Sequence, residues 1–265
     1  MILQMEIFRK DRLIIKRLSS RKEMGQTAAA DVAAAIQKLL KTKDHIRMIF
    51  AAAPSQNEFL EALSIDKAID FNRIIAFHMD EYTGLSADAP QGFGNFLKIR
   101  LFKKCPFKEI FYLNGQAKDV EKECSRYTEL LNREPIDIVC MGIGENAHIA
   151  FNDPAVADFN DPKTVKIVPL DLVCRQQQVN DGCFKQIDEV PKFAFTLTVS
   201  ALLNCDQIFC IVPGKTKTEA VYNSISTGIS NKYPASILRS HKKAVMYVDT
   251  DSGARLKEIT GLVNV

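Results

Sequence analysis

Polar side chains of complementary kinds follow one short apolar run of the sequence. Residues 136–141 are too few for a typical helix and rich in β-branched side chains, which is typical of a buried parallel strand. Gly142 and Gly144 come next and allow a tight turn in which backbone N–H groups approach a ligand closely. The polar residues that complete this stretch are Asn146, His148, Asn152 and Asp153.

The chemistry open to this stretch is proton transfer. An imidazole and a carboxylate such as His148 and Asp153 can take and return a proton near neutrality, as the opening of a sugar ring requires. Open α/β sheets place their ligand crevices at the carboxyl ends of strands, where this stretch lies. A glycine-rich turn with a surface histidine and a capped helix start is the alternative, because a lone G-x-G spacing is a weak signal.

A second group of carboxylates follows another apolar run, residues 74–78. Asp80 and Glu81 stand next to each other just after it, so they cannot both point into one site if the strand continues. A carboxylate of tunable pKa is the base needed to move a proton next to a carbonyl. Asp80 and Glu81 are therefore candidates for such a base and for substrate binding.

Two loops are suited to binding an anion. Ser55 lies in a turn at 54–57 before an expected helix at 58–63, and a helix N-terminus favours negative charge. Residues 213–219 form a glycine-containing loop that leads into a helix and carries Lys217, without the spacing of a P-loop. Together these loops predict a phosphate site.

We expect neither a metal ion nor another cofactor. The four histidines and seven cysteines show no metal-ligand spacing, and His78 is interpreted as a packed residue at a strand end. The cysteines are scattered and several stand in apolar runs, and the sequence shows no cleavable signal peptide. These features predict reduced thiols and a cytoplasmic location.

Composition excludes several classes of protein. Lys and Arg exceed Asp and Glu by 35 to 32, which is too small an excess to indicate a nucleic-acid partner. No apolar run approaches about 18 residues, so we expect no membrane span. The basic residues cluster at 1–24, a segment that we interpret as an N-terminal extension with a solvated face rather than a membrane or nucleic-acid patch.

The order of expected elements indicates the architecture that must position these groups. Strands and helices alternate along the chain, which predicts a single α/β domain over 1–265 with a Rossmann-like, doubly wound, mostly parallel sheet and helices on both faces. The polar segment at 171–189 interrupts the pattern and is either an exposed helix and loop or a mobile lid. Expected strands are 47–53, 74–78, 110–113, 136–141, 165–168, 193–199, 207–212 and 244–248, and expected helices are 26–40, 58–63, 92–104 and 120–131.

With these motifs in place, the chain resembles the glucosamine-6-phosphate deaminase/isomerase family, which shares its fold with 6-phosphogluconolactonases. The resemblance extends from about residue 26 onward and rests on residues 79–85, 142–154 and 190–192 and on Gly214 with Lys217. The Met-Asp-Glu-Tyr and Phe-Asn-Asp-Pro runs favour the deaminase branch over the lactonase branch.

The resemblance implies roles for individual residues. Asp80 matches the base that moves a proton between C2 and C1 of the open-chain sugar phosphate, and His148 matches the acid and base that opens the ring. Asp153 stands where the family usually has a glutamate that assists this histidine. Glu81 and Gly144 complete the set expected to surround the substrate.

The phosphate-binding residues match less completely. Lys217 matches a phosphate-binding lysine, and Ser55 falls in the phosphate loop, although Ala53 and Pro54 replace the usual glycine pair. The segment 171–189 matches a lid that contributes an arginine, for which the candidates are Arg175 or, in a gapless alignment, the uncharged Gln178.

Asn146 is the most serious departure, because the family has an aspartate beside the histidine there. An asparagine can still accept an imidazole N–H, so we expect the geometry to survive. Loss of the opposite charge should reduce the stability of the imidazolium by about 1.4 kcal/mol. In a serine-protease triad, the analogous change costs on the order of 10⁴ in rate.

Three hypotheses follow. The first is a cofactor-free enzyme that isomerises and deaminates a hexosamine 6-phosphate, such as glucosamine 6-phosphate or an epimer like galactosamine 6-phosphate, to a ketose phosphate and ammonia. The second is a non-catalytic sensor of sugar phosphates that keeps the phosphate site. The third is a hydrolase of the 6-phosphogluconolactonase type. The sequence leaves open the epimer, any allosteric effector and the oligomeric state, a homo-oligomer included.

Overall fold

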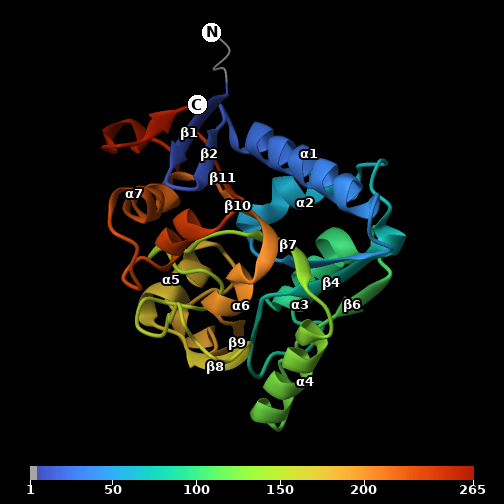
Figure 1. The fold of residues 1–265 in the computed structure, drawn as a ribbon. Coiled ribbons are helices and arrows are strands. Elements are labelled where there is room, and N and C mark those ends of the chain that lie inside the picture. The colour runs from blue at the N-terminus through green and yellow to red at the C-terminus, as the bar shows by residue number, and fades with distance from the viewer. Residues whose placement is uncertain (1–4) are drawn as a thin grey trace.

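A nine-stranded sheet forms the centre of the protein in this computed structural model, which describes residues 5–265 (Figure 1). Its strand order is β12-β1-β2-β11-β10-β7-β3-β4-β6. The seven strands β2-β11-β10-β7-β3-β4-β6 all pair in parallel with their neighbours. At the other edge, β1 pairs antiparallel with both β2 and β12. The strands are β1 Glu6–Lys10, β2 Leu13–Arg17, β3 Ile46–Phe50, β4 Ile74–His78, β6 Glu109–Phe111, β7 Ile136–Met141, β10 Cys205–Val212, β11 Ala244–Val248 and β12 Val263–Asn264.

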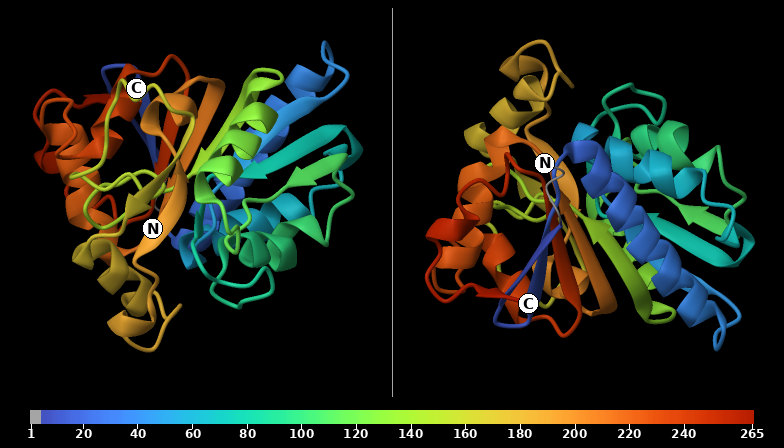
Figure 2. Two further views of the ribbon diagram at one scale, coloured as in Figure 1. Left: turned by 90° about the horizontal axis from the view of Figure 1, so that it is seen from below. Right: turned by 90° about the horizontal axis from the view of Figure 1, so that it is seen from above.

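Helices cover both faces of this sheet, as the βα alternation predicted. On β3, Met48 and Phe50 pack in one hydrophobic cluster with α1 and α2, whereas Ile49 packs on the opposite face in a cluster with α4 and α7. Opposite views show α1 in front of one face and α4 in front of the other (Figure 2). The helices are α1 Arg21–Leu40, α2 Asn57–Ser64, α3 Phe93–Leu97, α4 Val120–Asn132, α5 Leu172–Asn180, α6 Val199–Leu203 and α7 Thr218–Ser226.

A second, three-stranded antiparallel sheet carries Asp80 and Glu81. It has the order β5-β9-β8, with bounds β5 Asp80–Tyr82, β9 Phe193–Leu197 and β8 Val165–Pro169. Strand β5 begins two residues after β4 ends, and Asp80 pairs with Thr196 of β9. The sequence did not reveal β5, because three residues are too short for a period of two to be recognised.

Within the basic segment expected at 1–24, residues 6–17 belong to the central sheet rather than to an extension, and residues 1–4 lie outside the described residues. Residues 6–17 form the hairpin of β1 and β2, and β2 pairs in parallel with β11. Phe8, Leu13 and Ile15 of the hairpin are buried, whereas Arg9 and Arg12 between them are exposed. Ser20 then caps α1 by accepting a hydrogen bond from the Glu23 N–H at 3.2 Å.

The polar segment at 171–189 forms α5, a loop and a short 3₁₀ turn at Ile187–Glu189. Asp171 caps α5 by accepting from the Cys174 N–H at 2.6 Å. Within residues 5–265, no helix combines the length and hydropathy needed to cross a membrane.

Candidate active site

A cleft opens at the carboxyl ends of the parallel strands. The chain winds outward through β3, β4 and β6 in one direction and through β7, β10 and β11 in the other, so the strand order reverses between β3 and β7. Ligands of open α/β sheets bind at such a reversal. The cleft has an empty volume of about 490 Å³, its open mouth included. Its lining includes Ser55, Asp80, Gly144, His148, Gln177, Gln178 and Lys217.

Asp80 presents a carboxylate without a hydrogen-bonding partner among residues 5–265 to this cleft. Burial, and then the negative charge of Glu81, raises the pKa of Asp80 well above its ordinary value. The backbone beneath it is held by His78, whose Nδ1 lies 2.9 Å from the Asp80 carbonyl oxygen and whose Nε2 accepts from the Leu113 N–H. Burial lowers the pKa of His78 to about 4, so His78 is a neutral packed residue, as predicted.

Glu81 does not face the cleft, which corrects its assignment to substrate binding. Its carboxylate accepts hydrogen bonds from the backbone N–H groups of Tyr82, Phe93 and Gly94 at 2.8–3.1 Å. Adjacent residues of a strand point to opposite sides, so with Asp80 in the cleft Glu81 must point away. The Glu81 side chain instead anchors the first turn of α3 to β5.

We expect Glu81→Gln to destabilise the protein, because the amide nitrogen would meet a backbone N–H and leave it unsatisfied. The free energy of unfolding should fall by about 1–3 kcal/mol. Urea denaturation measures this change. Asp80→Asn is the matched control and should not destabilise the fold, since it removes a buried carboxylate that has no partner. Equal stability of both variants would show that Glu81 does not anchor α3.

His148 and Asp153 form a buried pair beside the turn after β7. Nδ1 of His148 lies 2.9 Å from Oδ1 of Asp153, and Asp153 is 1% exposed. Burial opposes ionisation of Asp153, but the contact with His148 and a hydrogen bond from Asn146 outweigh it and lower the pKa of Asp153. Gly144 must lack a side chain because a Cβ there would lie 2.1 Å from Cε1 of His148.

Asn146 does not bind the imidazole, contrary to the expectation from sequence. Its Nδ2 donates to Oδ1 of Asp153 at 3.0 Å, and its Oδ1 accepts from the backbone N–H of His148 at 3.1 Å. The Asn146 side chain therefore contacts the backbone of His148 directly, but it reaches the imidazole only through Asp153. Ala147, which follows it, has a φ of 66°, a left-handed conformation that is costly for any residue with a Cβ.

Two of the expected phosphate residues line the cleft. Lys217 is 4% exposed, and its ammonium has no ion-pair or hydrogen-bond partner among the described residues. Burial lowers its pKa, whereas the charges of Asp181 and Glu145 oppose that change. Ser55 accepts from Gln56 Nε2 at 3.2 Å in the turn that leads into α2. An uncompensated ammonium near a helix N-terminus is suited to an anion.

Arg175 does not reach the cleft. Its guanidinium donates to the carbonyl oxygens of Ile187, in the same segment 171–189, and of Val190, just after it, at 2.6 and 3.1 Å. Gln177 and Gln178 face the cleft instead, and Gln177 Oε1 accepts from the Glu145 N–H at 2.9 Å. The gapless alternative, in which the uncharged Gln178 occupies the position of the arginine, therefore fits the geometry.

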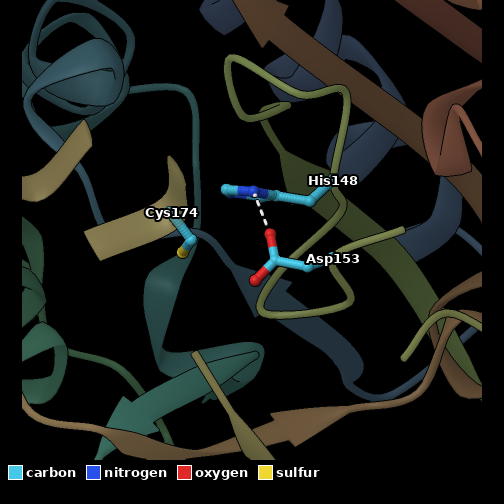
Figure 3. Close-up of side chains that lie close together, drawn as sticks. All are labelled: His148, Asp153 and Cys174. Carbon is cyan, nitrogen blue, oxygen red and sulfur yellow. Dashed lines mark ion pairs between the residues drawn. The ribbon is translucent and has the colours of Figure 1, made fainter. Parts of the chain in front are cut away.

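Sequence reasoning missed Cys174. This residue of α5 is fully buried, and its side chain converges with those of His148 and Asp153 (Figure 3). No sequence spacing could have indicated this, because the fold brings the thiol to the pair from a separate helix.

Comparisons with known proteins agree with this geometry. The family model described as "Glucosamine-6-phosphate isomerases/6-phosphogluconolactonase" matches residues 19–247, a range that contains every residue of the cleft. The chain belongs to this family.

Members of the family resemble the chain over most of its length. A glucosamine-6-phosphate deaminase of Listeria monocytogenes serotype 4a is 32% identical over 215 residues, covering 81% of this chain and 90% of the relative. One from Lactobacillus delbrueckii subsp. bulgaricus is 29% identical over 245 residues, covering 92% and 99%.

Two solved structures superpose on this chain over most of its length. A monomeric glucosamine-6-phosphate deaminase superposes with a TM-score of 0.83 at 30% identity, covering 91% of this chain and 98% of that one. A 6-phosphogluconolactonase of Thermotoga maritima superposes with a TM-score of 0.72 at 20% identity, covering 89% and 99%. The second likeness shows the common fold alone.

Proposed function

We propose that this protein isomerises and deaminates a hexosamine 6-phosphate, giving a ketose 6-phosphate and ammonia. The observation that carries the proposal is the partner-free carboxylate of Asp80 in the same cleft as the His148–Asp153 pair. The names of the relatives agree with this activity. The test is to incubate the protein with glucosamine 6-phosphate and its epimers and to measure the ketose phosphate and ammonia formed. If no hexosamine 6-phosphate is converted, the proposal is refuted.

The cleft supplies groups for the proton transfers at the ring oxygen and at carbon. His148, held by Asp153, donates to the ring oxygen as the sugar opens to its aldehyde form. Ionised Asp80 then removes the proton from C2 and returns it to C1. At the same time O1 gains a proton and the C2 amine loses one, so the aldehyde and the amine become an alcohol and a C2 imine. Water adds to that imine, and ammonia leaves. The raised pKa of Asp80 increases its tendency to accept the C2 proton.

Removing the charge of Lys217 should weaken the binding of phosphorylated ligands more than that of unphosphorylated ones. An ammonium–phosphate hydrogen bond is charge-assisted and contributes about 1.5–3 kcal/mol, so Lys217→Met should raise Kd for the sugar phosphate about 10- to 100-fold. Calorimetric binding of the phosphorylated and unphosphorylated amino sugar measures this. Lys215→Met is the control, because Lys215 is exposed two residues away. An equal loss for both sugars would remove Lys217 from the phosphate site.

Adding a charge at Gln178 should strengthen phosphate binding. Gln178 lines the cleft, so Gln178→Arg places a guanidinium where a phosphate accepts paired hydrogen bonds. We expect KM for the sugar phosphate to fall about tenfold, by roughly 1.4 kcal/mol. Gln176→Arg, on the exposed side of α5, adds the same charge outside the cleft and should leave KM unchanged. A fall in KM for both variants would indicate general electrostatic attraction instead.

A non-catalytic sensor of sugar phosphates is the second candidate, and two positions favour it. Asn146 and Gln178 are uncharged where the resemblance implied an aspartate and an arginine. Asp80 favours turnover, since binding alone does not require a buried carboxylate without a partner. A sensor would bind sugar phosphates without releasing ammonia. The lactonase hypothesis has less support, because the lactonase structures resemble this chain at 20% identity or less.

The lid and the location complete the proposal. Gln177 and Gln178 bring α5 over the cleft, which supports a lid at 171–189 that closes on the substrate. All seven cysteines are free thiols, which supports a cytoplasmic location. The epimer accepted, glucosamine or galactosamine 6-phosphate, is to be decided by comparing kcat/KM for the two.

A further inference from the structure

Three side chains that commonly bind metals converge beneath the lid. Atoms that can act as ligands in His148, Asp153 and Cys174 all lie within 4.8 Å of one another. The residues are 8%, 1% and 0% exposed, respectively. His148 and Asp153 come from the loop after β7, whereas Cys174 comes from α5, so the cluster joins the lid to the body of the protein (Figure 3).

The cluster contains polar atoms that the protein itself does not satisfy. Oδ2 of Asp153 has no hydrogen-bond partner among the described residues, and Nδ1 of His148 approaches Oδ1 of Asp153 without the alignment of a hydrogen bond. Buried polar atoms are nearly always paired, so each exception requires an explanation. Here Nδ1 of His148 faces Asp153, and the Asp153 carboxylate lies next to the Cys174 thiol.

We propose that His148, Asp153 and Cys174 bind a borderline-soft divalent cation of the Zn²⁺ type. Imidazole nitrogen, carboxylate oxygen and thiolate sulfur are the three ligand types of zinc, with bonds of about 2.0–2.3 Å. Ligand atoms of a tetrahedral site lie roughly 3.5 Å apart, so the three side chains, whose ligand atoms lie within 4.8 Å of one another, must draw closer when an ion binds.

The charges around the cluster favour a cation. The carboxylates of Asp153, Asp171 and Asp80 lie near enough to the Cys174 sulfur to act on it electrostatically, and they attract a dication. On binding, the S–H bond breaks, the sulfur–metal bond forms and the proton goes to solvent. Affinity should therefore increase with pH, with about one proton released for each ion bound.

Occupancy of this site would inhibit the enzyme and keep the lid closed. The ion takes up the imidazole and carboxylate that the ring opening uses, and it fixes α5 through Cys174. This consequence goes beyond the proposed function and rests on it only for the activity measurement. Binding of the ion itself does not depend on which reaction the protein catalyses.

Cobalt spectroscopy tests the site directly. The chelator-treated protein is titrated with Co²⁺, whose bond to a thiolate gives a near-ultraviolet charge-transfer band. We expect the band to saturate at about one ion per chain. Replacing a residue that only hydrogen-bonds to a metal ligand costs about 10–100-fold in metal affinity. Cys174→Ser removes a ligand itself, so it should abolish the band and weaken Co²⁺ and Zn²⁺ binding at least about 100-fold. His148→Gln should weaken binding similarly and retain the thiol.

The control and the contrary results are distinct. Cys183→Ser removes a thiol from the same segment, 171–189, that is not in the cluster, and it should keep both band and affinity. If circular dichroism shows that Cys174→Ser does not fold, the loss of the band in Cys174→Val and the loss of affinity in His148→Gln test the site instead. A wild-type protein without the band, or a band that only Cys183→Ser removes, would overturn the proposal. Reversible Zn²⁺ inhibition of ammonia release that Cys174→Ser abolishes would support it, whereas a catalytically inactive protein with the band would refute only the proposed function.

Discussion

Asp80→Asn should abolish exchange of the C2 proton of the hexosamine 6-phosphate with solvent. An amide cannot accept that proton, and general base catalysis contributes about 10²- to 10⁴-fold, so turnover should fall by the same factor. Substrate affinity should change by less than about threefold, because the base acts in the transition state rather than in ground-state binding. Proton NMR in heavy water follows the exchange, and calorimetry gives the affinity.

The pH dependence of this exchange tests the environment of Asp80. The base acts only when ionised, and burial with the nearby charge of Glu81 raises its pKa. As the pH is lowered, exchange should therefore be lost at a higher pH than the ordinary aspartate value of about 3.9 would give. Wild-type exchange in Asp80→Asn at any pH would remove Asp80 from the mechanism.

Asn146→Asp should reduce turnover on the order of 100-fold. The new carboxylate would replace an amide that donates to Asp153 at 3.0 Å, so two negative groups would face each other in a buried site. Their repulsion would displace Asp153 from His148, and a misplacement of about 1 Å at a catalytic group can cost 10²-fold. The sequence alone suggested the opposite result, namely that an aspartate here would restore a missing charge beside the imidazole.

A second substitution should recover the activity. Glutamate at position 153 is one methylene longer, as in the resembling family, and changes the geometry between the two carboxylates. We expect the double variant Asn146→Asp with Asp153→Glu to exceed Asn146→Asp in kcat at least about tenfold, since residues in contact are coupled. Asp153→Glu alone completes the cycle. Additive effects of the two changes would show that Asn146 and Asp153 do not act as a unit.

Periodicity and propensity predicted the elements that dominate the core. Strands β4, β7 and β11 have the predicted bounds, because an apolar run closed by glycine or a polar turn has few alternatives. The β1–β2 hairpin was missed, since its cationic residues masked the alternation of Phe8, Leu13 and Ile15. Its burial depends on β11, which is more than 220 residues away.

The sequence predicted which residues lie in the candidate site, but not where several of their side chains point. Asp80, His148, Asp153 and Lys217 were identified from strand ends and motif resemblance, and the fold brings them to one region. The directions of Glu81 and Arg175 depend on backbone groups that no motif specifies. The orientation of Asn146 depends on the shorter Asp153, and the approach of Cys174 depends on the docking of α5.

Product analysis in deuterated water tests the central claim most directly. Wild-type protein is incubated with glucosamine, galactosamine and mannosamine 6-phosphates, and ammonia, ketose 6-phosphate and deuterium are measured together. We predict equal amounts of ammonia and ketose from at least one sugar, with solvent deuterium at C1 of the product, and no such product with Asp80→Asn. Tight binding of these sugars without any ammonia, or ammonia release that persists in Asp80→Asn, would contradict the account.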